Sequence, residues 1–385
     1  MQKEFHLSQA DVKRLAEQFG TPLLVMSVEQ VKNNYRTLKE FMPRVNIHYA
    51  VKANPDERIV RTLKDLGSCF DVASDGEIFQ LQEMGISGDR MVFANPIKPV
   101  HSIETARQAG ISYYMVDSEP EIEKMARVAP GAGVLVRVRM QNPEALIDLN
   151  KKFGAEPTDV MRLLLKARDC GLDVAGLAFH VGSQATQHHA YLNAIKLCRG
   201  LFDEAMTHGM NLRILDIGGG FPIRVPGSEK INIQAIFSSI NTALEEYFPS
   251  IEIWAEPGRF ICGTAVKLIT RVIGKQHRDN QDWYFLDEGI YGTFSGVIFD
   301  HWDYELLSFK EESLISATFA GPSCDSFDVI FREKETVRLD VDDLILVPDI
   351  GSYSSASATT FNGFSKAKVI VWEQLGDVIR LDTAV

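Results

Sequence analysis

The sequence predicts an α/β protein: a TIM-type (β/α)8 barrel with a second, mainly antiparallel β domain. Between residues 47 and 259, eight apolar, β-rich runs alternate with amphipathic helical segments, and after about residue 261 β-rich runs follow one another without long helices. Continuous apolar strands separated by helices are typical of a parallel sheet, and the count of eight favours a closed barrel. A chain of 385 residues that is 45% hydrophobic can bury such a core.

The expected elements follow in order along the chain. The barrel strands are expected in residues 47–54, 69–74, 91–95, 113–118, 134–140, 176–183, 213–221 and 251–259. Helical segments between them include 56–67, 75–85, 101–110 and 158–171. The later β-rich runs are 265–275, 282–292, 315–321, 328–339, 343–351 and 367–374. We therefore divide the chain into an N-terminal segment, 1–27, whose strand at 21–27 returns to the β domain, a barrel at 28–261 and a β domain at 262–385.

Composition limits the classes of partner. The net charge of −12 comes from acids and bases that are mixed along the chain, which argues against nucleic acid as a partner. The charged N-terminal stretch lacks a signal-type apolar core, and no stretch is long and apolar enough to span a bilayer, so we expect no membrane association and a cytoplasmic location. The five cysteines are scattered without a C-x-x-C pair, so no metal site and no disulfide framework is expected.

A single lysine, Lys52, interrupts the apolar run IHYAVKANPDERIV at residues 47–60. One interpretation is an edge strand whose lysine faces solvent, since lysine is among the residues least often buried. The other is an amine that condenses with a carbonyl of a substrate or cofactor, because burial favours the neutral, nucleophilic form. Five further strand ends carry polar or glycine residues, which favours the second interpretation: Asp71, Arg137, His180 with Ser183, Gly218 to Gly220, and Glu256 with Arg259.

These strand ends suggest one cofactor. In LDIGGGFP, three consecutive glycines are consistent with a tight turn or with backbone N–H groups that bind a phosphate, and AEPGRF places Glu256 and Arg259 at the next strand end. A carboxylate that faces a pyridine nitrogen keeps it protonated, as pyridoxal phosphate requires when it accepts electrons. In this setting His180 of FHVGSQ is interpreted as a ring stacked on the cofactor rather than a core histidine or general base, and Ser183 as a donor to phosphate.

Seven motifs in order, spread over nearly the whole chain, resemble those of the alanine-racemase-fold (fold type III) pyridoxal-phosphate decarboxylases, and within them the ornithine decarboxylase branch, bacterial lysine/ornithine enzymes included. The motifs are YAVKAN, FDVASDGEI, FHVGSQ, LDIGGGFP, AEPGRF, GPSCDSFDVI and GSYSSASATTFNGF. The resemblance implies that Lys52 binds the cofactor covalently, that Glu256 faces the pyridine nitrogen and that His180 lies on the ring. It further implies a phosphate site made of Ser183, Gly218, Gly219, Gly220, Arg259 and Tyr353, and it places Asp71, Glu77 and Arg137 close to the cofactor.

The resemblance also concerns the substrate. It implies that Cys324 returns a proton to the α-carbon after CO2 leaves, that Asp300 and Asp325 bind the distal ammonium of a diamino acid, and that Phe299 and Phe361 lie beside the substrate. Phe299 is a departure, because many ornithine enzymes have tyrosine there. The motif Cys-Asp-Ser argues against diaminopimelate decarboxylases, which have Cys-Glu-Ser.

The expected activity is therefore conversion of L-ornithine to putrescine in polyamine biosynthesis, by a head-to-tail homodimer with shared active sites. A dual lysine/ornithine decarboxylase that also forms cadaverine is the alternative, because one methylene changes binding by only about 1–3 kcal/mol. A diaminopimelate decarboxylase and a non-catalytic regulatory homologue also remain open. A racemase or a small pyridoxal-phosphate carrier of the same barrel type is disfavoured by the β domain with its GPSCDSFD motif.

Overall fold

The structure, a computed structural model, describes residues 4–140, 152–224 and 231–376. The chain divides into two compact units. The barrel unit runs from Asn34 to Phe260, and the β unit contains the residues up to Asn33 and those from Ile261 onward.

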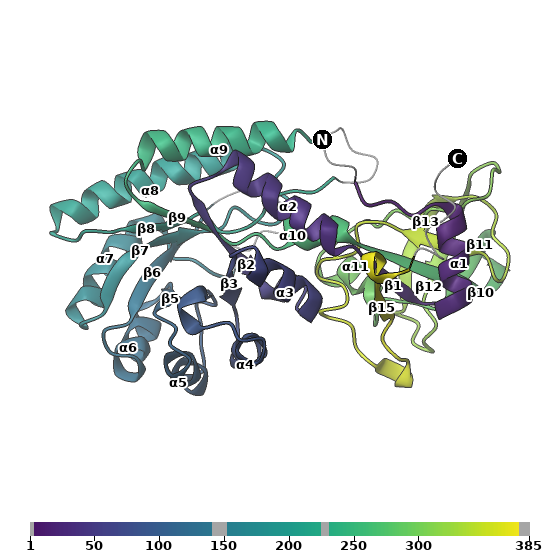
Figure 1. The fold of residues 1–385 in the computed structure, drawn as a ribbon, viewed down its shortest axis with the longest axis horizontal. Coiled ribbons are helices and arrows are strands. Elements are labelled where there is room, and N and C mark those ends of the chain that lie inside the picture. Colours follow the sequence, from purple (N-terminus) through teal and green to yellow (C-terminus); the bar gives the residue numbers. More distant parts are fainter. Residues whose placement is uncertain (1–3, 141–151, 225–230, 377–385) are drawn as a thin grey trace. The chain divides into compact units, whose positions relative to one another are not determined.

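The barrel unit contains the predicted closed parallel barrel, which confirms the fold expected from the sequence (Figure 1). Its strands are β2 (Val45–Ala50), β3 (Cys69–Val72), β4 (Met91–Phe93), β5 (Tyr113–Val116), β6 (Gly133–Val138), β7 (Asp173–Phe179), β8 (Ile214–Asp216) and β9 (Glu252–Ala255). The helices that surround them are α3 (Glu57–Asp65), α4 (Asp75–Glu83), α5 (Val100–Gln108), α6 (Glu119–Val128), α7 (Pro157–Asp169), α8 (His189–Thr207) and α9 (Ile233–Tyr247). Strand β9 pairs with β2 and closes the ring.

An apolar layer lies beneath the C-terminal ends of the barrel strands. A core cluster brings together side chains from β4 to β9, among them Leu135, Ile214 and Trp254. The Trp254 ring also packs on the buried His48 of β2, with 4.4 Å between ring centroids. Because side chains alternate between the two faces of a strand, the residues two positions further along share this face. Two positions after Leu135, Ile214 and Trp254 are the charged residues Arg137, Asp216 and Glu256. They meet at the C-terminal ends of the strands, which we call the barrel mouth.

A fully buried lysine, Lys98, joins the ends of β4 and β5. Its Nζ donates to the carbonyl oxygens of Asn95, Pro96 and Met115, at 3.1, 3.3 and 2.6 Å, and forms an ion pair with Glu121 of α6 at 3.1 Å. Burial lowers the pKa of Lys98 to about 8, although Glu121 opposes the shift. The ammonium thus ties the loop after β4 to the neighbouring strand and helix.

The β unit holds a mainly antiparallel seven-stranded sheet, as the sequence predicted. Its strands are β1 (Leu23–Met26), β10 (Val266–Arg278), β11 (Gln281–Leu286), β12 (Ile315–Ala320), β13 (Val329–Thr336), β14 (Leu344–Val347) and β15 (Lys368–Val371). Strand β1, from the start of the chain, lies antiparallel to β10 and parallel to β15. The remaining helices are α1 (Gln9–Phe19), α2 (Val28–Phe41), α10 (Arg259–Cys262) and α11 (Gly296–Phe299).

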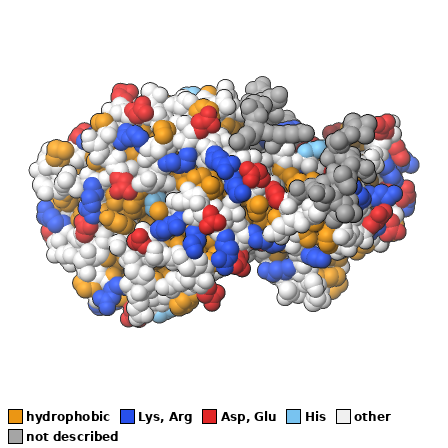
Figure 2. Space-filling model, viewed as in Figure 1, with side chains coloured by type: hydrophobic (Ala, Val, Ile, Leu, Met, Phe, Trp, Pro, Cys, Tyr) orange, Lys and Arg blue, Asp and Glu red, His pale blue; other side chains and the backbone are white. Residues whose placement is uncertain are grey.

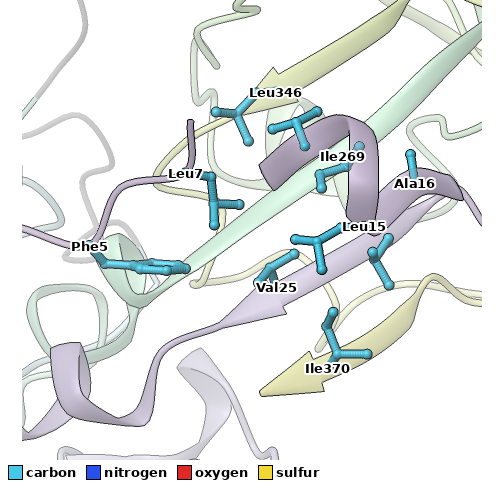
Figure 3. Close-up of a cluster of buried hydrophobic side chains, with 10 residues drawn as sticks. Phe5, Leu7, Leu15, Ala16, Val25, Ile269, Leu346 and Ile370 are labelled. Carbon is cyan, nitrogen blue, oxygen red and sulfur yellow. The ribbon is translucent and has the colours of Figure 1, made fainter. Parts of the chain in front are cut away.

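A hydrophobic cluster attaches the N-terminal segment to this sheet (Figure 3). Leu15 of α1 and Val25 of β1 pack with Ile269, Leu346 and Ile370, which come from β10, β14 and β15. All five side chains are buried, and at about 25 cal/mol per Å2 of apolar surface such burial is the main source of their stabilisation. Residues separated by most of the chain therefore share one core.

The N-terminus of α2 is capped by a residue near the end of the described chain. The Glu373 carboxylate accepts hydrogen bonds from the hydroxyl of Ser27, 346 positions earlier, at 2.5 Å, and from the backbone N–H groups of Val28 and Glu29 at 3.1 and 3.0 Å. A carboxylate at this position satisfies otherwise unpaired N–H groups and faces the positive end of the helix dipole.

Several expected strands end earlier than predicted, and the difference matters most for the first barrel strand. The run 47–54 was expected to be a strand throughout, but β2 ends at Ala50 and a 3-10 turn, η1 (Val51–Ala53), follows. Lys52 therefore lies just beyond the strand, in the turn, rather than within it.

The surface shows no area of a single charge on the face seen in Figure 2, where Lys and Arg side chains are interspersed with Asp and Glu. Among the helices within the described ranges, none is both long and apolar enough to cross a membrane.

Candidate active site

The lysine predicted to bind the cofactor contacts an acidic residue of the next strand. Lys52 Nζ donates to Oδ2 of Asp71, which lies on β3 and is completely buried. The Lys52 side chain is 46% exposed, so the amine is more open than the buried group expected from the sequence. Its position in the turn beyond β2 explains the exposure, because the turn lies past the strand end.

A layer of charged side chains, three of them buried and Arg137 half-buried, lies at the barrel mouth. Asp71, Arg137, Asp216 and Glu256 come from the ends of β3, β6, β8 and β9, and their charges influence one another strongly. Within the part of the chain that the structure describes, several of their buried atoms have no hydrogen-bond partner: Asp71 Oδ1, Asp216 Oδ2, Glu256 Oε1, and Nε and Nη2 of Arg137. Because unsatisfied buried polar atoms are costly, such a set is typical of a site that binds a polar ligand.

Two carboxyl groups of this layer, those of Asp216 and Glu256, resist ionisation. Burial raises the pKa of Asp216 to about 7, against the hydrogen bond from the Gly218 N–H, which lowers it. Burial, and then the neighbouring Asp216 and Asp71, hold the pKa of Glu256 well above its usual range. Burial also lowers the pKa of Arg137, while Glu256 opposes the shift. A group that neutralises these carboxylates, such as a protonated ring nitrogen, would therefore be bound favourably.

His180 follows β7 and is held in one orientation. Its Nδ1 accepts a hydrogen bond from the Gly182 N–H at 2.9 Å, so in the neutral ring the proton is on Nε2. Burial, and then the positive charges of Arg137 and Lys52, hold the pKa of His180 well below its usual range. The imidazole is therefore neutral and suited to packing against an uncharged ring.

The three glycines after β8 are required by close packing. A Cβ built on Gly218 or Gly220, which have φ of +66° and +96°, would collide with the carbonyl oxygens of Phe179 and Gly182 respectively. A Cβ on Gly219 would lie 2.5 Å from the carbonyl oxygen of Glu256 and 3.3 Å from Nε2 of His180. The loop thus lies directly beside the other strand ends of the barrel mouth.

Two side chains that sequence reasoning did not select hold this loop in place. Tyr191 of α8 is fully buried and donates its hydroxyl to the Gly219 carbonyl oxygen at 2.9 Å. The amide of Gln184 donates to the carbonyl oxygen of Ile223 at 2.7 Å and accepts from its N–H at 2.9 Å. Gln184 lies in the quoted FHVGSQ motif, and its positive φ of 57° places it in the left-handed region. A buried amide that pairs with one backbone unit in this way fixes the loop.

Two more of the predicted phosphate-site residues are also close together. Nη2 of Arg259 donates to the hydroxyl of Ser183 at 3.4 Å.

Glu77, predicted to lie near the cofactor, is in the first turn of α4, and its Oε2 accepts from the Ala73 N–H at 2.6 Å. Burial raises the pKa of Glu77 to about 7 despite this bond.

The other predicted residues belong to the β unit. Cys324 is exposed, and its backbone N–H and Sγ both donate to Oδ1 of Asn362, at 3.2 and 3.4 Å. Asp325 accepts from the Tyr291 hydroxyl and, at 3.1 Å, from the Phe327 N–H. The Tyr291 hydroxyl, and then the Phe327 N–H, lower the pKa of Asp325, so this carboxylate stays negatively charged.

Phe361 and the Cys324 loop are linked through Tyr291. The Tyr291 and Phe361 rings stack with centroids 4.2 Å apart and planes at 25°. Both rings line a cavity of about 270 Å3 that Ser323 and Asp328 also line. Buried Asp328 accepts from the N–H groups of Ser323 and Ile290, each at 3.0 Å, and so fixes the start of the Cys324 loop.

Three predicted residues lie in other loops of the β unit. Phe299 ends α11 and is 67% exposed, and the buried Asp300 follows it. Tyr353 has a positive φ of 51°, and its carbonyl oxygen would lie 3.4 Å from a Cβ built on Gly296, the first residue of α11. The Tyr353 and Phe299–Asp300 segments are therefore neighbours.

The sequence analysis left out Asp216, although it lies in the quoted LDIGGGFP motif. The usable signal was its place at the end of an apolar strand; in the barrel it pairs with Trp254 of the neighbouring strand, two positions before Glu256. No group of three or more His, Cys, Asp or Glu side chains in the described ranges could hold a metal ion.

Comparisons with known proteins agree with this geometry. Residues 28–263 match the family model for the pyridoxal-binding domain of pyridoxal-dependent decarboxylases. A lysine/ornithine decarboxylase from Selenomonas ruminantium is 46% identical over 371 residues, which are 96% of this chain and 94% of that protein. A crystal structure of lysine decarboxylase from Selenomonas ruminantium has a TM-score of 0.94 at 45% identity, with 98% of this chain and 100% of the other covered. The lysine/ornithine decarboxylase of Vibrio vulnificus complexed with putrescine has a TM-score of 0.89 at 36% identity and covers 96% of this chain and 100% of its own.

Proposed function

The chain belongs to the pyridoxal-dependent decarboxylases, and we propose that it converts L-ornithine to putrescine and CO2 with pyridoxal phosphate as its cofactor. The observation that carries the proposal is the charged layer at the barrel mouth, in which Asp71, Arg137, Asp216 and Glu256 have open hydrogen-bonding positions. A dual activity on L-lysine is the second candidate, because the Selenomonas ruminantium relative is named for both substrates.

The residues at the barrel mouth fit the cofactor. Pyridoxal phosphate has a basic ring nitrogen, an aldehyde and a phosphate, and the barrel mouth offers a suitable group for each. We propose that Lys52 binds the aldehyde carbon, that Glu256 faces the ring nitrogen, that His180 packs on the ring, and that Asp71, Glu77 and Arg137 surround it. The proposed phosphate site contains Ser183, Gly218, Gly219, Gly220, Arg259 and Tyr353.

When bound, pyridoxal phosphate supplies a ring that takes up the electrons of the broken C–CO2 bond. The chain's own residues set the conditions for this chemistry. A protonated ring nitrogen would offset the burial that raises the pKa of Glu256, so the Glu256 carboxylate and the ring N–H would stabilise each other. Asp71 holds the Lys52 ammonium whenever the amine is free. Neutral His180 covers the ring without adding positive charge. Cys324 then donates a proton to the α-carbon.

The substrate's distal ammonium is assigned to Asp325 and Asp300. Asp325 is kept anionic by the Tyr291 hydroxyl and the Phe327 N–H, which suits a cation and disfavours an extra carboxylate such as that of meso-diaminopimelate. Phe299 and Phe361 are assigned to the aliphatic part of the substrate. The solved Vibrio vulnificus relative holds putrescine, which supports a diamine-sized site.

We further propose a homodimer in which the β unit of a partner subunit contributes Cys324 and Asp325 to the barrel mouth. This follows from the resemblance described above, and a cytoplasmic role in polyamine biosynthesis follows from it in the same way. Sedimentation velocity, with activity measured in the same samples, tests the dimer. An active monomer would overturn this part of the proposal.

The test of function is a product assay on the purified protein with pyridoxal phosphate and equal concentrations of L-ornithine, L-lysine, L-arginine and meso-diaminopimelate. Putrescine alone supports an ornithine decarboxylase, and comparable cadaverine supports the dual enzyme. Lys52→Ala should form no amine, while Lys166→Ala, a surface lysine of α7 paired with Glu123, should match the wild type. Wild-type activity in Lys52→Ala would contradict the assignment.

Two alternatives remain distinguishable in the same assay. With each substrate in a separate reaction, formation of L-lysine from meso-diaminopimelate would identify a diaminopimelate decarboxylase. Formation of cadaverine from meso-diaminopimelate would require loss of both carboxyl groups. A preparation that stays colourless with added pyridoxal phosphate, and forms no amine, would identify a non-catalytic regulatory homologue.

A further inference from the structure

One atom in the β unit accepts two hydrogen bonds from Cys324. Oδ1 of Asn362 lies 3.2 Å from the backbone nitrogen of Cys324 and 3.4 Å from its Sγ. The backbone N–H can only donate, so the end of the amide that faces Cys324 is its oxygen. The Cys324 backbone N–H therefore fixes the orientation of the Asn362 amide. The Cys324 thiol directs its hydrogen at the same amide oxygen.

The position of Asn362 is held independently of Cys324. Its backbone is in the left-handed region, with φ of 54° and ψ of 14°, inside the 3-10 turn η6 (Phe361–Gly363). The turn is anchored because Phe361 stacks on Tyr291 and its N–H donates to the hydroxyl of Thr359 at 3.2 Å. The Thr359 N–H in turn donates to the Tyr291 carbonyl oxygen at 2.7 Å. The backbone turn that carries the Asn362 amide is thus anchored by contacts that do not involve Cys324.

We propose that Asn362 is a positioning residue for proton delivery: its amide oxygen holds the thiol hydrogen of Cys324 in one direction until the α-carbon is ready to receive it. This inference rests on the proposed function, in which Cys324 is the acid. In the step itself the S–H bond breaks, a C–H bond forms at the α-carbon, and the thiolate later takes a proton from water. The amide neither gains nor loses a proton, because its oxygen only accepts a hydrogen bond.

If the thiol is misdirected, the proton can instead be added to the cofactor's former aldehyde carbon, which would be bonded to the substrate nitrogen. One amino acid and one cofactor aldehyde then give CO2, an aminoaldehyde and the amine form of the cofactor, with atoms and electrons balanced. The ratio of diamine to CO2 therefore reports where the proton goes. A purely structural role for Asn362 would lower both products together.

The test measures CO2 and diamine in the same reaction of the loaded enzyme. Asn362→Gly removes the amide but retains a residue that tolerates positive φ. We expect nearly one diamine per CO2 in the wild type and a lower ratio in Asn362→Gly. The fraction of CO2 that is not matched by diamine should rise about three- to tenfold, the factor that corresponds to the net free energy of one hydrogen bond. Asn362→Asp keeps an acceptor oxygen and should restore the ratio to nearly the wild-type value.

The matched control is Asn280→Gly. Asn280 lies in the turn between β10 and β11 with a similar φ of 59°, so it reproduces the backbone change away from Cys324. Its product ratio should equal that of the wild type. A reduced ratio in this control, or an unchanged ratio in Asn362→Gly, would overturn the inference while leaving the proposed function intact.

A second readout uses the cofactor-free protein. Iodoacetamide should alkylate Cys324 faster in Asn362→Gly, and more slowly in Asn362→Asp, than in the wild type, because the S–H···O contact is lost in one and strengthened in the other. Peptide mass spectrometry separates Cys324 from the other four cysteines. Equal rates of Cys324 alkylation in the three proteins would contradict the contact between the thiol and Asn362. This readout does not depend on whether the wild type releases CO2. A wild type without CO2 release would instead refute the proposed function. Should Asn362→Gly fail to fold, Asn362→Ala carries the same expectations.

Discussion

Replacing Gly219 by alanine would test whether the loop after β8 needs a residue without a side chain. The added Cβ would lie 2.5 Å from the Glu256 carbonyl oxygen, whereas ordinary contacts begin at 3.4 Å, so the backbones must separate by about 0.9 Å. They are joined by the hydrogen bond from the Glu256 N–H to the Gly218 carbonyl oxygen at 2.7 Å, which opposes the separation. The Nε2 of His180, 3.3 Å from the new Cβ, must also shift.

The expected cost follows from these contacts. Overpacking costs about 1–3 kcal/mol, and a weakened backbone hydrogen bond adds about 1 kcal/mol. We therefore expect Gly219→Ala to lower the free energy of unfolding of the cofactor-free protein by about 2–4 kcal/mol. Loss of one charge-assisted hydrogen bond to the proposed phosphate would weaken cofactor binding by about 10- to 100-fold.

Urea unfolding followed by circular dichroism measures the first effect, and absorbance titration with pyridoxal phosphate measures the second. Gly200→Ala is the matched control in the same unit, because Gly200 lies within α8 and a Cβ there would meet nothing within 4 Å. It should raise the free energy of unfolding by about 0.5–1 kcal/mol. If Gly219→Ala matched this control in both measurements, the packing argument for the glycine loop would be refuted.

Three further predictions concern buried or bridging side chains. Lys98→Met should lower the free energy of unfolding by about 3 kcal/mol, because it leaves the buried Glu121 carboxylate and three carbonyl oxygens without this partner. Urea titration of the double variant Lys98→Met/Glu121→Leu should not recover the loss, because Glu121 also accepts from the Lys98 N–H and pairs with Lys124. Tyr291→Phe keeps the stacked ring but removes the hydroxyl that lowers the pKa of Asp325, so steady-state kinetics should show a raised KM for ornithine with a smaller change in kcat; an unchanged KM would count against Asp325 as the ammonium site. Burial lowers the pKa of His48 to about 4. Because this folded-state value is below the unfolded value of about 6.5, the unfolded chain binds more protons between these pH values, and stability falls as the pH falls. His48→Gln should therefore lose about 3 kcal/mol less than the wild type between pH 7 and pH 4, and parallel stability curves would disprove the assignment.

The strand pattern was predictable because each barrel strand is an apolar run that ends in a polar or glycine residue. The C-terminal ends of parallel strands meet at one end of a barrel, so Asp71, Arg137, His180 and Glu256 could be grouped without coordinates. The exact strand ends could not be predicted, because they depend on how the barrel closes. Lys52 is an example: local β propensity predicts a strand through Asn54, while pairing with β9 ends at Ile47 and pairing with β3 ends at Ala50.

The residues that support the site were harder to predict, because they act through contacts between distant segments. Tyr191 reaches the Gly219 carbonyl, and Asn362 reaches Cys324, 38 positions away. Nothing in the local sequence of α8 or of the FNGF segment marks these residues as different from core or surface residues. Their roles depend on the fold that brings the segments together.

The Glu373 cap on α2 also has a consequence for protein synthesis. Strand β1 pairs with β10 and β15, and the Ser27–Glu373 bond joins positions 346 residues apart. At about 5–20 residues per second, a ribosome needs roughly 20–70 seconds to cover that interval. The barrel unit can assemble from its own emerging segment during this time, whereas Leu23–Met26 has no neighbouring strand until β10 emerges and lacks β15 until the last part of the chain appears. Shortening the gene by even the codons for β15 and Glu373 would leave this first strand with one open edge and α2 without its cap.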